Sequence, residues 1–275
     1  VGLFGKDRLI FVGSERSSLV TVWRDRGVGQ PPQYLQALPA GSGPEGLLAI
    51  PQRNLLVVAS ENDGAARSSV MIYQRGAAEP AYPTLMSSDS ASGTPIPWGA
   101  ISGFSADRKQ PGSLWAVTDS VYATTRILQI DANFSPALVT SAITVTKGGK
   151  PVGFDGEGIA QRADGGFWIA SEGDPDKKGG ALKDLLVRVN AKGEVQEEIA
   201  LPESLSRHAV RFGLEGVTTT GEGEQEAVWL AVQREWKDDP KGMVKILRYT
   251  PATQAWGVLH YPLDTTTASG GWVGL

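Results

Sequence analysis

A short motif, Glu-Gly followed by a hydrophobic residue, recurs along the chain at nearly constant spacing. It stands at Glu45-Gly46-Leu47, Glu157-Gly158-Ile159 and Glu215-Gly216-Val217, and Ser102-Gly103-Phe104 occupies the intervening place without the acid. The first residues of the four segments are 57, 55 and 58 positions apart. Repeats of this length mark folds in which one structural unit is used several times, so we expect the chain to be built from such units.

Each motif is followed by two further segments with the alternation and β-branched content of β-strands. Second strands are expected at Leu55–Ser60, Leu114–Asp119, Phe167–Glu172 and Val228–Gln233. Third strands are expected at Ser69–Tyr73, Arg126–Ile130, Leu185–Val189 and Lys245–Tyr249. An opening half-unit is expected at Leu9–Gly13 and Leu19–Trp23.

Repeated units of several strands each are typical of an all-β fold, the β-propeller of four-stranded antiparallel blades, and at least five blades are expected in part or whole. A β-sandwich is the alternative, but it does not predict a recurring Glu-Gly core. We expect residues 1–275 to form a single propeller domain. We also expect a fragment of a longer chain, because the sequence stops within an apolar segment that starts a new unit near Trp272.

Charge and composition exclude several classes of function. A net charge of −4 and a pI near 5.4 argue against nucleic-acid binding. No apolar stretch is long enough to cross a bilayer as a helix. The chain has no cysteine and only two histidines, His208 and His260, neither at a repeated position, so a zinc site or a histidine-based triad is not expected.

The acids of the repeat are expected at one rim of the propeller, because the start of each first strand and the end of each second strand meet there. If Asp164 and Gly165 form a two-residue hairpin turn, Glu157 lies directly opposite Glu172. Like charges in that position are destabilising. A bound cation, an inserted basic residue or a protonated carboxyl would have to offset the repulsion.

A rim of carboxylate oxygens suits Ca²⁺ or, as the alternative, Mg²⁺ far better than zinc. The predicted metal ligands are Glu45, Glu61, Asp119, Glu157, Glu172 and Glu215. The structural alternative is that each glutamate caps backbone amides or pairs with a nearby basic residue, so that the acids fix the junctions between blades.

The segments Phe154–Ala160 and Phe167–Gly173 resemble the bacterial phytase-like family described as having esterase-like activity, whose repeats carry Asp-x-Glu-Gly-Ile/Leu and a later Ser-Glu. The resemblance covers roughly residues 43–275. It implies an exported bacterial propeller, periplasmic or extracellular, whose acids hydrolyse phosphoesters. The corresponding acids are Glu45, Glu61, Asp119, Asp155, Glu157, Glu172 and Glu215. This chain departs from the pattern at Ser102-Gly103 and at Gln233-Arg234.

The leading hypothesis is a metal-dependent phosphoric-ester hydrolase whose catalytic acids are Asp155, Glu157 and Glu172. Arg16, Arg126 and Lys183 are the predicted phosphate-binding residues. The substrate would be a small phosphate ester or a lipid-derived one. Two other hypotheses stay open: a non-catalytic propeller that binds a protein or glycan, and a lactonase-like hydrolase with one central metal.

Overall fold

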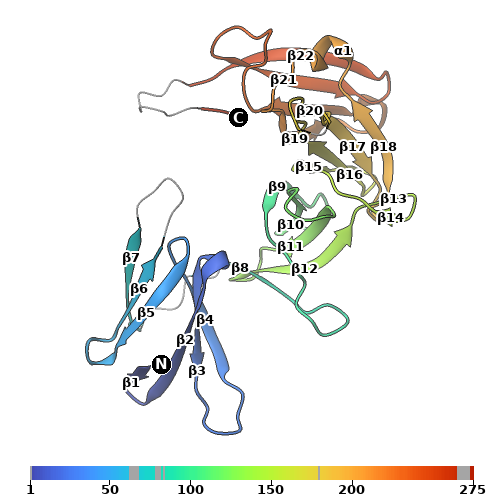
Figure 1. Cartoon of the computed structure of the whole chain (residues 1–275). Helices are drawn as coiled ribbons and strands as arrows, with labels where there is room; N and C mark the ends of the chain where they lie inside the picture. Colours follow the sequence, from blue (N-terminus) through green and yellow to red (C-terminus); the bar gives the residue numbers. More distant parts are fainter. Residues whose placement is uncertain (1, 62–67, 78–81, 83, 179, 265–272) are drawn as a thin grey trace. The chain divides into compact units, whose positions relative to one another are not determined.

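In the computed structural model, almost all of the regular elements among the described residues are β-strands (Figure 1). The structure describes residues 2–61, 68–77, 82, 84–178, 180–264 and 273–275. The new unit expected near Trp272 begins outside these residues. Within them, no helix has the length and hydropathy needed to cross a membrane.

The chain divides into two compact units, Val1–Met86 and Ser87–Leu275. The boundary falls inside β8 (Leu85–Ser87). The expectation of a single domain over 1–275 stays a prediction.

The first unit contains two antiparallel sheets. One has four strands in chain order: β1 (Gly2–Phe4), β2 (Asp7–Ser14), β3 (Leu19–Arg24) and β4 (Gln33–Pro39). The other has three: β5 (Pro44–Ile50), β6 (Leu55–Ser60) and β7 (Ser69–Gln74). The 3₁₀ helices η1 (Glu15–Ser17) and η2 (Pro51–Arg53) form two of the turns.

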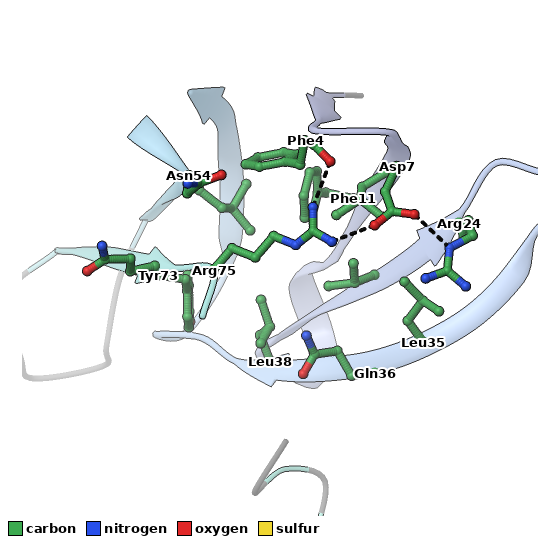
Figure 2. Close-up of a pocket in the computed structure, with 14 residues that line it drawn as sticks. Phe4, Asp7, Phe11, Arg24, Leu35, Gln36, Leu38, Asn54, Tyr73 and Arg75 are labelled. Carbon is green, nitrogen blue, oxygen red and sulfur yellow. Dashed lines mark hydrogen bonds and ion pairs between the residues drawn. The ribbon is translucent and has the colours of Figure 1, made fainter. Parts of the chain in front are cut away.

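An apolar cavity of about 140 Å³ lies in the first unit, and an ion-pair network forms part of its wall (Figure 2). Arg75 Nη1 donates a hydrogen bond to the Phe4 carbonyl oxygen at 2.7 Å, and its other terminal nitrogen contacts the Asp7 carboxylate. Arg24 pairs with the same carboxylate at 3.2 Å. The hydrogen bond from Arg75 is the main reason why the pKa of Asp7 is lowered.

The second unit contains three blades. The first has the strand order β8-β12-β11-β10-β9, with β9 (Ile101–Ala106), β10 (Ser113–Thr118), β11 (Arg126–Asp131) and β12 (Ala137–Thr144). The second contains β15 (Gly156–Gln161), β16 (Phe167–Ser171), β17 (Leu185–Val189) and β18 (Val195–Ala200). The third contains β19 (Leu214–Thr220), β20 (Ala227–Val232), β21 (Met243–Thr250) and β22 (Ala255–Pro262). The connections include the hairpin β13 (Thr146–Lys147) and β14 (Lys150–Pro151), α1 (Glu203–Ser206) and η3 (Gly223–Gln225).

These sheets confirm the predicted fold class, a β-propeller of four-stranded antiparallel blades, and the described residues contain five blades in part or whole. All four predicted second strands are strands, β6, β10, β16 and β20, with bounds that differ by at most one residue. The predicted third strands correspond to β7, β11, β17 and β21, and the opening half-unit to β2 and β3.

The core of the second unit lies between blades, and β16 contributes to it on both faces. Phe167 and Ile169 pack toward the blade that contains β10 and β11. Trp168 and Ala170 pack toward the blade that contains β20 and β21. All four are at most 1% exposed. Because side chains alternate between the faces of a strand, a central blade needs a continuous apolar run, which this segment supplies.

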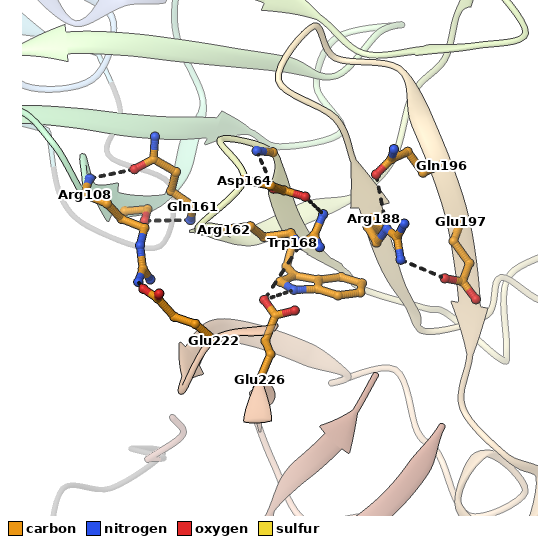
Figure 3. Close-up of polar contacts among 12 residues, drawn as sticks. Arg108, Gln161, Arg162, Asp164, Trp168, Arg188, Gln196, Glu197, Glu222 and Glu226 are labelled. Atoms are coloured by element: carbon orange, nitrogen blue, oxygen red, sulfur yellow. Dashed lines mark hydrogen bonds and ion pairs between the residues drawn. The ribbon is translucent and has the colours of Figure 1, made fainter. Parts of the chain in front are cut away.

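The arginines shown in Figure 3, Arg108, Arg162 and Arg188, lie at the edge of the blades where β15 ends. Arg162 pairs with Asp164 at 2.8 Å, and Arg108 contacts Glu222. Trp168 Nε1 donates to Glu226 Oε1 at 3.0 Å and so joins two blades. Several basic groups of this unit are therefore paired far from the ends at which β9, β15 and β19 begin.

The glycine of the repeated motif allows the first strands of neighbouring blades to approach backbone to backbone. A Cβ on Gly103 would lie 2.7 Å from the Glu157 carbonyl oxygen, and one on Gly158 would overlap the Glu215 carbonyl oxygen. No side chain other than hydrogen fits between the strands at these two positions.

Gly158→Ala is therefore expected to destabilise the protein by about 1–3 kcal/mol, because the backbone of β19 would have to move. Gly216→Ala is the matched control, since the same motif position in the next blade would place its Cβ 3.8 Å from the Ala231 Cβ, an ordinary contact. Urea unfolding measures both variants. Equal stability of the two would contradict the close approach.

Candidate functional site

The first residue of each repeated motif occupies a β-bulge. β15 pairs with β16 through Gly156↔Ser171 and Gly158↔Ala170, which leaves Glu157 as the extra residue. Glu215 lies in the equivalent irregularity of β19, and Glu45 in that of β5. A bulge re-aims a side chain and interrupts regular pairing. Each acid thus stands outside the ordinary alternation of its strand.

The predicted pairing of Glu157 directly opposite Glu172 is wrong. Gly165 N donates to the Arg162 carbonyl oxygen, and Arg162 N donates to the Gly166 carbonyl oxygen, so the hairpin loop holds three residues instead of two. The bulge then shifts the register again. Glu172 N donates to the Asp155 carbonyl oxygen at 2.8 Å, and Asp155 is therefore its neighbour across the sheet.

Three carboxylates from two neighbouring blades meet at the start of β15. One oxygen each of Asp119, Asp155 and Glu157 can be chosen so that all three lie within 4.8 Å of one another. Asp119 follows β10, and its Oδ1 accepts a hydrogen bond from Ser120 Oγ at 3.0 Å. Ser102 Oγ donates to Glu157 Oε2. We call these three residues the acidic trio.

Burial is the largest cause of the raised pKa values of Asp155 and Glu157. The negative charge of Asp119 raises both further, whereas hydrogen bonds from Ser120 to Asp155 and from Ser102 to Glu157 lower them. The trio is therefore a place where negative charge is crowded and only partly solvated, which favours a bound cation or a proton.

Two more glutamates extend the trio toward the next blade. The pKa of Glu172 is raised to about 7, mainly by burial and also by the charge of Glu157. A hydrogen bond from Gly213 N at 2.9 Å acts in the opposite direction and lowers it. Burial also raises the pKa of Glu215 to about 7, with the charges of Glu157 and Glu172 as the next causes. Gln233 Nε2 donates to Glu215 Oε1.

These two raised pKa values predict a pH-dependent stability in the absence of divalent cations. Between their ordinary value of 4.5 and about 7, the folded protein holds protons that the unfolded chain releases. The stabilisation is complete below pH 4.5 and is lost as the pH rises to about 7. The melting temperature in chelator should fall from pH 5 to pH 7.5, and Glu215→Gln should reduce the fall. A melting temperature that rises over this interval would contradict the crowding of these carboxylates.

Sequence reasoning missed Asp184, a buried carboxylate beside Glu172. Its side chain accepts hydrogen bonds from Gly173 N at 3.0 Å and Leu214 N at 3.1 Å. Burial raises its pKa despite these bonds, and its charge contributes to the raised pKa of Glu172. The sequence did contain a signal for Asp184, namely its position directly before a third strand. Ser68 and Thr125 are polar residues at the equivalent position of two other blades.

The remaining predicted metal ligands, Glu45 and Glu61, lie in the first unit. Glu45 is an exposed residue of β5, and Glu61 N donates to the Gly43 carbonyl oxygen at 2.9 Å after the end of β6. Their membership of one site with the acids of the second unit stays a prediction.

The three predicted phosphate-binding residues have different surroundings. Arg16, in the first unit, has a side chain that is 94% exposed and pairs with Glu15 at 3.5 Å. Arg126 Nη1 donates to the Pro97 carbonyl oxygen at 3.3 Å, and its guanidinium lies 5.6 Å from the centre of the Tyr122 ring. Lys183 is exposed and directly precedes Asp184. Their roles toward phosphate stay predictions.

The donor set of the trio fits a hard divalent cation. Every atom that it offers is a carboxylate oxygen, the ligand type that Ca²⁺ and Mg²⁺ prefer. Two oxygens bound to one Ca²⁺ at about 2.3–2.6 Å can be no more than roughly 5 Å apart, which the trio satisfies. Serine hydroxyls at its edge could complete the coordination.

A sequence model of the family described as phytase-like, with esterase-like activity of phytase, matches residues 96–275. The matched segment contains the acidic trio, Glu172, Asp184 and Glu215. No curated protein sequence matches the chain.

Several solved structures resemble the chain at low similarity. A functionally unknown protein from Desulfotomaculum acetoxidans DSM 771 is 12% identical, with 90% of this chain and 64% of that chain covered and a TM-score of 0.33. The WD40 repeats of RRP9 are 13% identical, with coverages of 94% and 64% and a TM-score of 0.32. A Bombyx mori β-fructofuranosidase is 13% identical, with coverages of 58% and 34% and a TM-score of 0.31. The chain thus spans 64% of the length of each of the first two.

Proposed function

The chain belongs to the phytase-like family, and from this premise we propose that it is a divalent-cation-dependent phosphoric-ester hydrolase. The proposed cation is Ca²⁺, with Mg²⁺ as the alternative. The observation that carries the proposal is the acidic trio, in which three carboxylates from two blades lie within 4.8 Å of one another.

Asp119, Asp155 and Glu157 are the residues that would hold the cation. When bound, it would polarise the phosphoryl group and neutralise charge that develops on the phosphate oxygens. The bulge at Glu157 serves this role, because it takes this residue out of regular pairing, and the Glu157 carboxylate lies beside Asp119 of the neighbouring blade. The hydrogen bond from Ser102 holds one oxygen of that side chain in place.

Glu172 is the proposed general base. It lies next to the trio, and its Oε1 accepts a hydrogen bond from Gly213 N, which fixes its orientation. In the proposed reaction a water oxygen forms a bond to phosphorus while the ester P–O bond breaks. Glu172 takes the proton of the attacking water, and the departing alcohol receives a proton from solvent.

Lys183 and Arg126 are proposed to bind phosphate oxygens, since both belong to the second unit and lie near the strand ends that carry the acids. Arg16 is proposed for the same role only if the first unit contributes to the site. An extracellular or periplasmic location is proposed as well, on the family resemblance alone.

The decisive experiment is turnover of a panel of phosphomonoesters, phosphodiesters and lactones by chelator-treated protein, before and after addition of Ca²⁺ or Mg²⁺. The proposal requires phosphoester hydrolysis that appears with the cation and disappears with chelator. Hydrolysis of lactones alone would favour a lactonase instead. Calcium binding without any turnover would favour a binding propeller and overturn the proposed hydrolase.

A further inference from the structure

A cavity of about 390 Å³ opens beside the candidate site in the second unit. It lies among the loop before β17, the end of β18 and the segment around α1. Six of its ten lining residues are apolar, among them Leu182, Ala200 and Leu201. A cavity of about 150 Å³ already binds benzene, so a cavity with this lining and size suits a larger apolar group.

Asp184 connects this cavity to the acids. It lines the cavity, and it also lies against Glu172, because a Cβ on Gly213 would contact the carboxylate of Asp184 and would lie 3.2 Å from Glu172 Cγ. A molecule that places its phosphate near the trio and Glu172 could therefore extend a substituent past Asp184 into the cavity.

The charges around the site limit the number of phosphates that the substrate can carry. Six carboxylates gather at this rim: Asp119, Asp155, Glu157, Glu172, Asp184 and Glu215. Lys183 is the one cationic side chain that lines the cavity among the described residues. Several phosphates would meet this negative surface with few cations to balance them, whereas one phosphate needs only the divalent cation, Lys183 and Arg126.

We propose that the substrate is an ester with a single phosphate and one apolar alkyl or aryl substituent, which occupies the cavity lined by Leu182, Ala200 and Leu201. The proposal rests on the proposed hydrolase function, since it assigns the phosphate to that site. It disfavours polyphosphorylated polyols as substrates.

The kinetic test is hydrolysis of methyl, butyl and hexyl phosphate in the presence of Ca²⁺. Each buried methylene strengthens binding by up to about fourfold, so kcat/KM should rise at least tenfold from methyl to hexyl phosphate. Inositol hexakisphosphate should be turned over less efficiently than hexyl phosphate. Equal kcat/KM across the alkyl series, or a preference for the hexakisphosphate, would overturn the proposal.

Variants connect this preference to the cavity. Ala200→Trp fills it from an exposed position at the end of β18 and should reduce the ratio of hexyl to methyl kcat/KM to below threefold. Leu182→Gln, in the exposed loop, should lower the same ratio without involving a strand. Thr144→Trp is the matched control, because Thr144 is the exposed last residue of β12, the equivalent fourth strand, and does not line the cavity. An unchanged ratio in both cavity variants would contradict the assignment.

Binding of non-hydrolysable alkylphosphonates separates failure of this proposal from failure of the hydrolase. In calorimetry with Ca²⁺, hexylphosphonate should bind at least tenfold more tightly than methylphosphonate, and Ala200→Trp should remove the difference. If no ester is hydrolysed but this difference is present, the hydrolase fails and the cavity assignment stands. If esters are hydrolysed but the two phosphonates bind equally, the cavity assignment fails alone.

Discussion

Replacing Glu157 with glutamine is expected to lower phosphoester turnover by at least about 100-fold and to remove most of the rise in melting temperature caused by Ca²⁺. The substitution keeps the shape of the side chain and an oxygen that can accept the Ser102 hydrogen bond, but it removes one of the three charges of the acidic trio. In the unchanged protein, a hundredfold excess of Ca²⁺ over its dissociation constant should stabilise the fold by about 2.7 kcal/mol.

The measurements are thermal unfolding with Ca²⁺ and with chelator, and turnover of the best phosphoester. Glu198→Gln is the control, since Glu198 lies on β18 and forms an ion pair with Lys147 at 2.8 Å, outside the trio. It should leave both readouts nearly unchanged. If the Glu157→Gln protein keeps the full calcium response, the role of Glu157 is structural. If it keeps turnover, Glu157 does not take part in catalysis.

Lys245→Met is expected to cost about 3–5 kcal/mol of stability, the largest structural effect that we predict. The Lys245 side chain is 2% exposed, and its Nζ lies 2.7 Å from Asp238 Oδ1 and in contact with Asp239, whose side chain is fully buried. Asp239 also accepts hydrogen bonds from Trp236 N at 2.8 Å and contacts His260 Nε2 at 2.9 Å. Without the lysine, a buried carboxylate would lose its strongest partner.

Lys147→Met provides the comparison, because the Lys147 side chain is 57% exposed and exposed ion pairs contribute about 0–1 kcal/mol. Urea unfolding of both variants gives the two free energies. If Lys245→Met costs no more than Lys147→Met, the buried network does not stabilise the fold. A partial recovery in Lys245→Met with Asp239→Asn would identify the unpaired carboxylate as the cause.

The strands could be predicted from the sequence because their signal is local. Each second strand is a short apolar run, and the recurrence of the motif placed four of them in equivalent units before any contact was known. The alternation in Lys245–Tyr249 even placed Lys245 on the same face as Leu247 and Tyr249, both of which are buried. Its partners Asp238 and Asp239 could not be predicted, because they reach it through the fold of a loop.

The detail of the candidate site was less predictable, because it depends on single-residue shifts in pairing. The residues Asp164 and Gly165 are compatible with either a two-residue turn or a three-residue hairpin loop. The structure has the three-residue loop, in which Gly165 adopts φ +87°. The bulge at Glu157 moves the partner of Glu172 once more, to Asp155. Neither shift in strand pairing can be predicted from the pattern of apolar and polar residues.

The close packing at Gly103 and Gly158 means that the two blades containing these glycines can change their chemistry without changing their architecture. Ser102 stands where the other motifs carry the acid, yet β9 has the irregular pairing beside Gly103 and the tight approach to β15. The glycine at these positions therefore has to be kept, whereas the residue before it can change. A propeller of this kind can gain or lose one charge per blade through a single substitution, which gives evolution, or an engineer, a simple way to retune the site in graded steps.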